Sequence, residues 1–148
     1  NERANLERMA SAMGVRSAVE FVGAVPRDEI VAYYSAADVL AMPSVTEPED
    51  GLNVCVLDAM SCSLPIVATT VAGNPLVVED GHNGYLVPER RADLIADALA
   101  RLYSDRRRLR SMGQAGRRRV EAEFAWSHLA ARYLEHFERI AAGRSTAP

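Results

Sequence analysis

The feature that most constrains the fold of this chain is an alternation of short apolar runs with helical patterns, which continues as far as Pro88. Helical patterns at 26–37, 52–63 and around 76–78 separate runs that have the length and apolar content of buried strands: "SAVEFVG" at 17–23, "DVLAMPS" at 38–44, "PIVATT" at 65–70 and "YLVP" at 85–88. This order favours right-handed crossover connections. It therefore predicts an α/β fold in which a parallel sheet is covered by helices on both faces.

Both ends of the chain are predicted to be helical. After Arg91, three amphipathic patterns follow one another, and each is expected to pack through one apolar stripe. Near the N-terminus, a helix is expected to stop at Gly14, because glycine readily adopts the left-handed conformation of a helix cap. The chain begins at Asn1 inside that helical pattern, without a cap or strand before it. We therefore expect it to be an excerpt from a longer polypeptide.

Composition limits the classes of partner. The chain has 148 residues, of which 49% are hydrophobic, as expected for one domain with a real core. A net charge of -3 gives no general attraction to nucleic acid or to an anionic membrane. The basic runs "RRRLR" and "RRRV" lie at helical spacing without interleaved aromatic residues, so we interpret them as a solvated helix face. With no long apolar segment and no signal segment at its start, the protein is expected to be cytoplasmic.

Neither a disulfide nor a metal site is expected. Cys55 and Cys62 are seven residues apart in a helical pattern, so they share a face but are too distant for a bond, and we expect buried thiols. The three histidines are scattered and show no metal-ligand spacing. The acids of the "TEPED" loop could hold a divalent cation, but such loop acids are usually solvated. No GxGxxG fingerprint is present, so no redox dinucleotide or other cofactor is expected.

An aspartate in the predicted apolar helix at 52–63 needs an explanation. Asp58 has mostly apolar helix neighbours, and a desolvated carboxylate without a partner would cost several kcal/mol. It either reaches solvent or an arginine, or it accepts hydrogen bonds from the hydroxyls of a ligand. At the start of the helix, Asp50 and Gly51 could form a structural N-cap, or they could present free N–H groups to an anion such as a phosphate.

The order of these segments resembles a known family. "EDGLNVCVLDAMSCSLPIVATTVAGNPLVVEDGHNGYLVP", with the flanking "VEFVGAVPRDEIVAYYSAADVLAMPS" and "RADLIADALARLYSDRRRLRSMGQAGRRRVEAEFAWSHLAARYL", is similar to the C-terminal donor-binding domain of retaining nucleotide-sugar glycosyltransferases of family 4. These enzymes have the type B fold of two facing Rossmann-like domains. The resemblance spans nearly the whole chain, and it implies that residues 1–148 are part of a Rossmann-like domain.

The resemblance also implies a donor site. Two acids with seven residues between them mark that site in the family, and they fall on Asp50 and Asp58. Asp58 would hold the ribose hydroxyls of a nucleoside-diphosphate sugar, and Asp50 would contact the donor sugar near the reacting carbon. The N–H groups of Gly51, Leu52 and Asn53 would meet the diphosphate or the sugar. Gly23 and Ala24 would line the base pocket.

Several positions depart from the family pattern. Asp50 and Asp58 stand where glutamate is usual, so each carboxylate reaches one methylene less, and Leu76 also stands where glutamate is usual. Ser63 replaces a helix-end glycine, and its left-handed conformation would cost about 1 kcal/mol.

By the same resemblance, the first two strands of the domain, the basic residues for the diphosphate and the whole acceptor-binding domain would lie before Asn1. Because the two strands belong between 17–23 and 38–44, residues 1–148 alone are expected to reorganise or self-associate and to bind a donor weakly.

The sequence therefore predicts the donor half of a glycosyltransferase that retains anomeric configuration, without nucleic acid as a partner. The full protein could also contact the inner face of the membrane peripherally. A non-catalytic sugar-nucleotide-binding or interaction domain derived from the same fold is the alternative. A nucleotide-sugar epimerase of this fold would need acid and histidine placements that the sequence does not show.

Overall fold

The computed structural model describes residues 2–47 and 51–142. They form two compact units, Asn1–Ile30 and Val31–Pro148, each of which is described by itself. The first unit contains α1 (Glu2–Ala12) and the short 3-10 helix η1 (Arg16–Ala18). The second contains nearly all of α2 (Ile30–Ala36) and the remaining elements, which are β1 (Leu40–Met42), α3 (Val54–Ser61), β2 (Ile66–Thr69), α4 (Asn74–Val77), β3 (Gly84–Val87), α5 (Ala92–Ser104), α6 (Arg106–Arg119), the π-helical turn η2 (Val120–Phe124) and α7 (Trp126–Ala141).

The first unit confirms one prediction and contradicts another. Gly14 has a φ of 70° directly after α1, as expected for the residue that ends a helix. The strand predicted at 17–23 is absent: residues 16–18 form η1, and residues 19–25 have no regular structure. A strand needs a neighbour to pair its backbone groups, and no strand occurs among the described residues of this unit. Instead, Arg3 donates a hydrogen bond of 2.9 Å to the carbonyl of Phe21.

The other three predicted strands form one parallel sheet in the order β1-β2-β3. Ala41 lies opposite Val67, and Val67 opposite Tyr85. All four residues of β2 are buried, as expected for a central parallel strand that is covered on both faces. The α/β architecture predicted from the sequence is therefore confirmed in this unit, together with its helical C-terminal segment.

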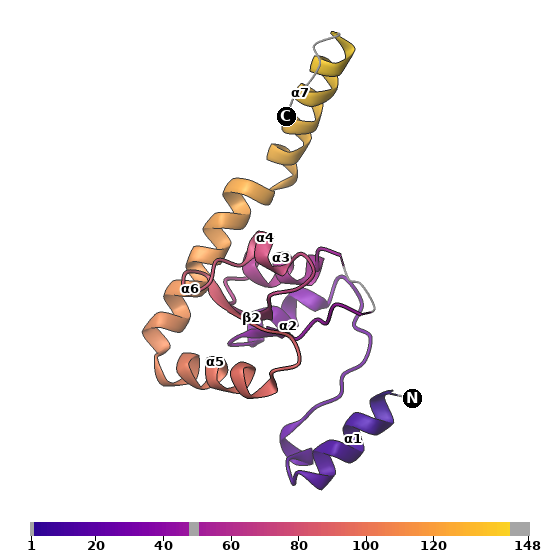
Figure 1. Ribbon diagram of the computed structural model, residues 1–148, viewed down its shortest axis with the longest axis vertical. Coiled ribbons are helices and arrows are strands. Elements are labelled where there is room, and N and C mark those ends of the chain that lie inside the picture. The colour runs from indigo at the N-terminus through magenta and orange to yellow at the C-terminus, as the bar shows by residue number, and fades with distance from the viewer. Residues whose placement is uncertain (1, 48–50, 143–148) are drawn as a thin grey trace. The chain divides into compact units, whose positions relative to one another are not determined.

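Two apolar clusters show which helices cover which face, and Figure 1 shows α3 and α4 on one side of β2 and α5 on the other. Ile66 and Ala68 of β2 pack with Val56 and Met60 of α3. On the opposite face Val67 belongs to a second cluster, with further members from α5 and α6: Ala98, Leu102, Leu109 and Met112.

Close backbone packing joins α6 to the end of α3. A Cβ added at Gly113 would lie 1.9 Å from the carbonyl oxygen of Ser63, so only glycine fits there. Ser63 itself has a φ of 62°, which confirms the predicted left-handed residue at the end of this helix.

Two predicted helix starts were wrong. α3 begins at Val54 with Asn53 as its N-cap residue, so Asp50 is not the cap. α2 begins at Ile30, after a turn, four residues later than the helical pattern at 26–37 predicted. Tyr34 of α2 packs against the apolar core cluster on one face of the sheet. β1 follows α2 along the chain.

Candidate functional site

The candidate site lies where the three strands end, because the carboxyl ends of parallel strands share one edge of the sheet. Residues 43–53 leave β1 there, and 70–73 leave β2. These two segments touch: the amide of Gly73 donates a hydrogen bond of 3.1 Å to the carbonyl of Gly51. A Cβ at Gly73 would lie 2.6 Å from the Cα of Leu52, so the approach of the two backbones requires glycine. The segment before α3 is thus held against the turn before α4.

A set of polar side chains joins the same segments, and we call Ser44, Asn53, Thr69 and Asn74 the strand-end network. Asn53 Nδ2 donates to Ser44 Oγ at 3.0 Å and to Asn74 Oδ1 at 3.4 Å. Asn74 Nδ2 donates to the Thr69 carbonyl at 3.1 Å, and Thr69 Oγ1 donates to the Ser44 carbonyl at 2.7 Å. Thr69 and Asn74 are fully buried, so these hydrogen bonds satisfy groups that water cannot reach.

Thr46, in the segment between β1 and α3, is hydrogen-bonded to Glu89, which follows β3. Glu89 accepts hydrogen bonds from the amide of Thr46 at 2.8 Å and from its hydroxyl at 2.9 Å. The Thr46 amide, the Thr46 hydroxyl and the nearby Arg90 hold the pKa of Glu89 below its ordinary value. This carboxylate is therefore charged in neutral solution, and it connects the ends of two strands that are not neighbours in the sheet.

Backbone donors are available at the start of α3. The amides of Gly51, Leu52 and Asn53 donate no hydrogen bond to any residue that the structure describes. These three amides lie directly before α3, whose N-cap residue Asn53 makes no side-chain cap hydrogen bond. Unpaired N–H groups at a helix start favour an anion, and a diphosphate has the charge and the oxygens to accept from them.

Asp58 lies one turn further along α3, on the face that it shares with Val54 and Ser61, and all three are exposed. Its carboxylate forms no hydrogen bond or ion pair within residues 2–47 and 51–142. The simpler interpretation, that Asp58 reaches solvent, therefore holds for the chain without a ligand. An exposed carboxylate beside unpaired backbone donors is also what a ligand with several hydroxyls needs.

A cleft of about 480 Å³ adjoins this face of α3. Leu52, Leu57 and Asp58 line one side, and Phe124 of η2 and Trp126 of α7 lie among the residues that line the rest. Most of the wall of this cleft is apolar. Trp126 contributes to the wall although 82% of its surface is exposed to solvent. Asp58 thus lines an apolar cleft to which Leu52, in the segment before α3, also contributes.

Tyr34 of α2 lies near α3, which contains Cys55 and has Cys62 as its C-cap residue. Burial, followed by the negative charges that Cys55, Asp58 and Cys62 can carry, raises the pKa of Tyr34. Its phenol therefore keeps its proton in neutral solution. Within the described residues Cys55 and Cys62 form no disulfide, and they are half-buried where burial was expected, because they lie on the flank of α3 between its buried and exposed faces.

Three predicted site residues lie elsewhere. Asp50 falls outside the described residues. Gly23 and Ala24 belong to the first unit, where Gly23 has a φ of 83°, and the structure does not test their expected place beside the base. Ser44, Thr69, Asn74 and Glu89 were missed by the sequence analysis. The one signal for Ser44, Thr69 and Glu89 is a polar residue within two positions of the end of a predicted strand, and Asn74 had no such signal.

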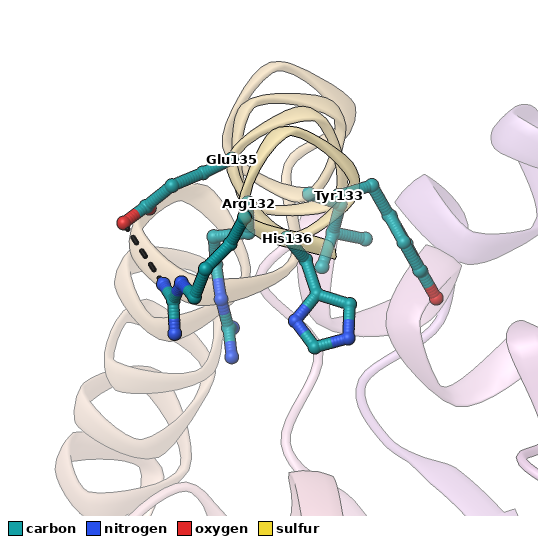
Figure 2. A pocket seen from close by; sticks show the side chains of 6 residues that line it. Arg132, Tyr133, Glu135 and His136 are labelled. Atoms are coloured by element: carbon teal, nitrogen blue, oxygen red, sulfur yellow. Dashed lines mark hydrogen bonds and ion pairs between the residues drawn. The ribbon is translucent and has the colours of Figure 1, made fainter. Parts of the chain in front are cut away.

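Another hollow, of about 410 Å³, does not form a comparable site. Figure 2 shows Arg132, Tyr133, Glu135 and His136 around it, and every lining residue belongs to α7. Arg139 and Glu135 form an ion pair of 3.1 Å on its rim. A hollow with one helix as its only wall cannot enclose a ligand. Within the described residues, no group of three or more His, Cys, Asp or Glu side chains could hold a metal ion.

The fold and this edge place the second unit among Rossmann-like α/β domains, which bind ligands at the carboxyl ends of their strands. The sequence profile of the family "Glycosyl transferases group 1" matches residues 1–105. The chain belongs to that family, as its motifs predicted.

Individual relatives agree with this assignment. The chain is 37% identical over 134 residues to the GDP-mannose-dependent alpha-(1-6)-phosphatidylinositol monomannoside mannosyltransferase of Mycobacterium tuberculosis H37Rv, over 88% of this chain and 35% of the relative. Sucrose-phosphate synthase from Thermosynechococcus elongatus superimposes with a TM-score of 0.85 and 32% identity, over 96% of this chain and 35% of that one. Anabaena HepE, solved with UDP-glucose, shares the fold with a TM-score of 0.81 at 21% identity. The chain thus spans about a third of the length of such relatives.

Proposed function

We propose that the chain is the donor-binding part of a family 4 glycosyltransferase, which moves a sugar from a nucleoside diphosphate to an acceptor with retention of anomeric configuration. The observation that supports this most directly is that the amides of Gly51, Leu52 and Asn53 donate to no residue that the structure describes, and that the carboxylate of Asp58, further along the same segment, is exposed. Membership of the glycosyl transferases group 1 family, and the named sugar-transfer activity of a relative that is 37% identical, support the same reaction class.

Each group has a role in this proposal. Asp58 accepts hydrogen bonds from the two ribose hydroxyls, because an ionised carboxylate offers acceptors to both at once. The amides of residues 51–53 stabilise the diphosphate, whose charge increases as the bond to the sugar breaks. Asp50 orients the donor sugar, and Gly23 with Ala24 lines the base pocket. Catalysis then depends on charge stabilisation and on positioning, without a nucleophile from this domain.

The acceptor side belongs, in this proposal, to a separate N-terminal domain, in agreement with the greater length of the relatives. The transfer uses no metal ion bound by this domain, because backbone amides and basic residues neutralise the diphosphate. A cytoplasmic location, at the inner face of the membrane where the acceptor is a lipid, completes the proposal. None of the described helices is long and apolar enough to cross a bilayer.

Calorimetric titration of the complete protein with GDP-mannose and with UDP-glucose tests the proposal. Asp58→Asn is expected to weaken binding of the preferred donor by about 1.5 to 3 kcal/mol, the contribution of one charge-assisted hydrogen bond. Asp97→Asn is the matched control, because Asp97 is also an exposed aspartate in mid-helix, on α5. Unchanged affinity in Asp58→Asn would return this residue to a solvated surface position.

A turnover assay distinguishes sugar transfer from donor binding without transfer. The chain has Leu76, 67% exposed, where similar proteins usually have glutamate, and this favours a non-catalytic sugar-nucleotide-binding domain as the second candidate. Radiolabelled donor should yield a glycosylated acceptor, and the anomeric proton coupling of the product should match that of the donor. Donor binding without transfer or donor hydrolysis would support the second candidate.

A further inference from the structure

We infer that the side chain of Asn53 is a positioning residue for the donor site: through the strand-end network it holds the amides of residues 51–53 in place. The inference rests on the proposed function, and it adds a role for the Asn53 side chain to the role of its backbone. Asn53 is the last residue before α3, and its amide group contacts both Ser44, which follows β1, and Asn74, which begins α4. One side chain thus connects three segments that leave the same edge of the sheet.

The hydrogen bonds determine how Asn53 must be oriented. The carbonyl of Thr69 can only accept, so Asn74 must turn its Nδ2 toward that oxygen. Asn74 Oδ1 then faces Asn53, which must present its own Nδ2 as the donor. Because Thr69 and Asn74 are fully buried, this chain of bonds cannot be replaced by water. The orientation of Asn53 is therefore set from inside the protein, and not by solvent or by a ligand.

Apart from the Asn53 side chain, few described contacts hold residues 51–53 in place. Before α3, the described backbone contact of residues 51–53 with the rest of the sheet edge is the 3.1 Å hydrogen bond from Gly73 to Gly51. Among the described residues, the amides of residues 51–53 have no acceptor that would fix their direction. Without the Asn53 side chain, the segment would be held at Gly73 alone, by the hydrogen bond to Gly51 and the close approach of Leu52, and residue 53 would lose its side-chain contacts with Ser44 and Asn74. Preorganised donors stabilise charge better than donors that must reorient, so this loss would weaken donor binding.

A matched asparagine separates positioning from stability. Asn83, like Asn53, makes two side-chain hydrogen bonds: it accepts from the Glu79 amide at 2.8 Å and donates to the Val77 carbonyl at 3.1 Å. Asn83 is fully buried, whereas Asn53 is half-buried. It precedes β3, so it lies at the opposite end of the strands from the candidate site. Replacing Asn83 should lower the melting temperature without changing the donor site.

The experiment measures the dissociation constant for GDP-mannose and for UDP-glucose, well below the melting temperature, in the complete protein. Asn53→Ala is expected to raise the constant for the preferred donor about tenfold, and Ser44→Ala, which removes only a hydroxyl, about threefold. The double variant should bind no worse than Asn53→Ala, because Ser44 acts through Asn53. Asn83→Ala should stay within about twofold of the unaltered protein while melting at a lower temperature.

Each other outcome has a definite meaning. Equal donor affinity in Asn53→Ala and the unaltered protein would overturn the inference and leave the proposed function intact. The same would hold if Asn83→Ala lost as much affinity as Asn53→Ala, since the effect would then be general loosening. If Asn53→Ala does not fold, Ser44→Ala carries the test, and unchanged affinity in that variant overturns the inference. An unaltered protein that binds neither donor would overturn the proposed function itself.

Discussion

Replacing Gly113 with alanine should expose how closely α6 packs on the end of α3. The new Cβ would lie 1.9 Å from the carbonyl oxygen of Ser63 and 2.8 Å from its carbonyl carbon, and both atoms are backbone. Neither can rotate away as a side chain would, so the helix or the turn must shift. Ser63 is already in the left-handed region, with a φ of 62°, which limits how the turn can adapt.

The magnitude follows from two opposing terms. Alanine stabilises a helix interior by about 1 kcal/mol relative to glycine, and overpacking of a well-packed contact costs about 1 to 3 kcal/mol or more. Since this overlap involves backbone, we take the upper end of that range and expect a net loss of about 2 kcal/mol in the free energy of unfolding. For a chain of this size, the loss corresponds to a melting temperature about 4 to 8 °C lower.

Gly116→Ala supplies the control on the same helix. Its Cβ would lie 3.4 Å from Met60 Cγ, an ordinary contact, so the gain in helix propensity should dominate and stability should rise by up to about 1 kcal/mol. Urea unfolding followed by circular dichroism measures both variants. If Gly113→Ala is as stable as Gly116→Ala, the close approach of α6 to Ser63 is not present in solution.

Two further predictions concern the turn after α3 and the tie at Glu89. Ser63→Gly should raise the free energy of unfolding by about 0.5 to 1 kcal/mol, because glycine has no steric cost at a φ of 62°, whereas Ala98→Gly within α5 should lower it; thermal melting measures both. The pKa of Glu89 is held below its ordinary 4.5, so the stability contributed by its contact with Thr46 should be complete above about pH 4.5 and lost as the pH falls through the lowered value. An NMR titration of the Glu89 carboxylate should show its pKa rising toward 4.5 in Thr46→Val, which removes the hydroxyl bond; an unchanged pKa would contradict this account.

The sequence predicted best those features that a few neighbouring residues determine. The strands at β1, β2 and β3 were recognisable because a buried parallel strand is a short, nearly continuous apolar run between turn residues. The left-handed conformation of Ser63 was expected from the family resemblance, in which a glycine ends this helix, because a left-handed residue commonly ends a helix. The run at 17–23 has the same local signature but forms no strand, because pairing depends on a neighbour that local sequence cannot supply.

The residues of the candidate site also differ in whether local sequence could predict them. Asp58 could be singled out because a carboxylate among apolar helix neighbours is unusual, whichever loops surround it. Asn53 and Asn74 could not be paired in advance, because they are 21 residues apart and meet only when β1 and β2 lie side by side. The start of α3 was predicted at Leu52, two residues before Val54, for a related reason. The local sequence at 50–51 has good cap chemistry, but Gly51 lies outside the helix, where its carbonyl accepts the hydrogen bond from Gly73.

Helix α3 carries residues of the proposed donor site, and different contacts hold its two ends. At its C-terminal end, the fit between Ser63 and Gly113 sets where the helix lies against α6. At its N-terminal end, Asn53 sets the direction of the amides that precede the helix. Asp58 lies between the two and moves with the helix. A shift at Gly113 should therefore move Asp58 and reduce stability together, whereas the loss of the Asn53 side chain should reorient the amides and leave Asp58 in place. In the proposed enzyme, Gly113→Ala would thus weaken binding of a nucleoside as well as of its diphosphate, and Asn53→Ala would weaken binding of the diphosphate alone.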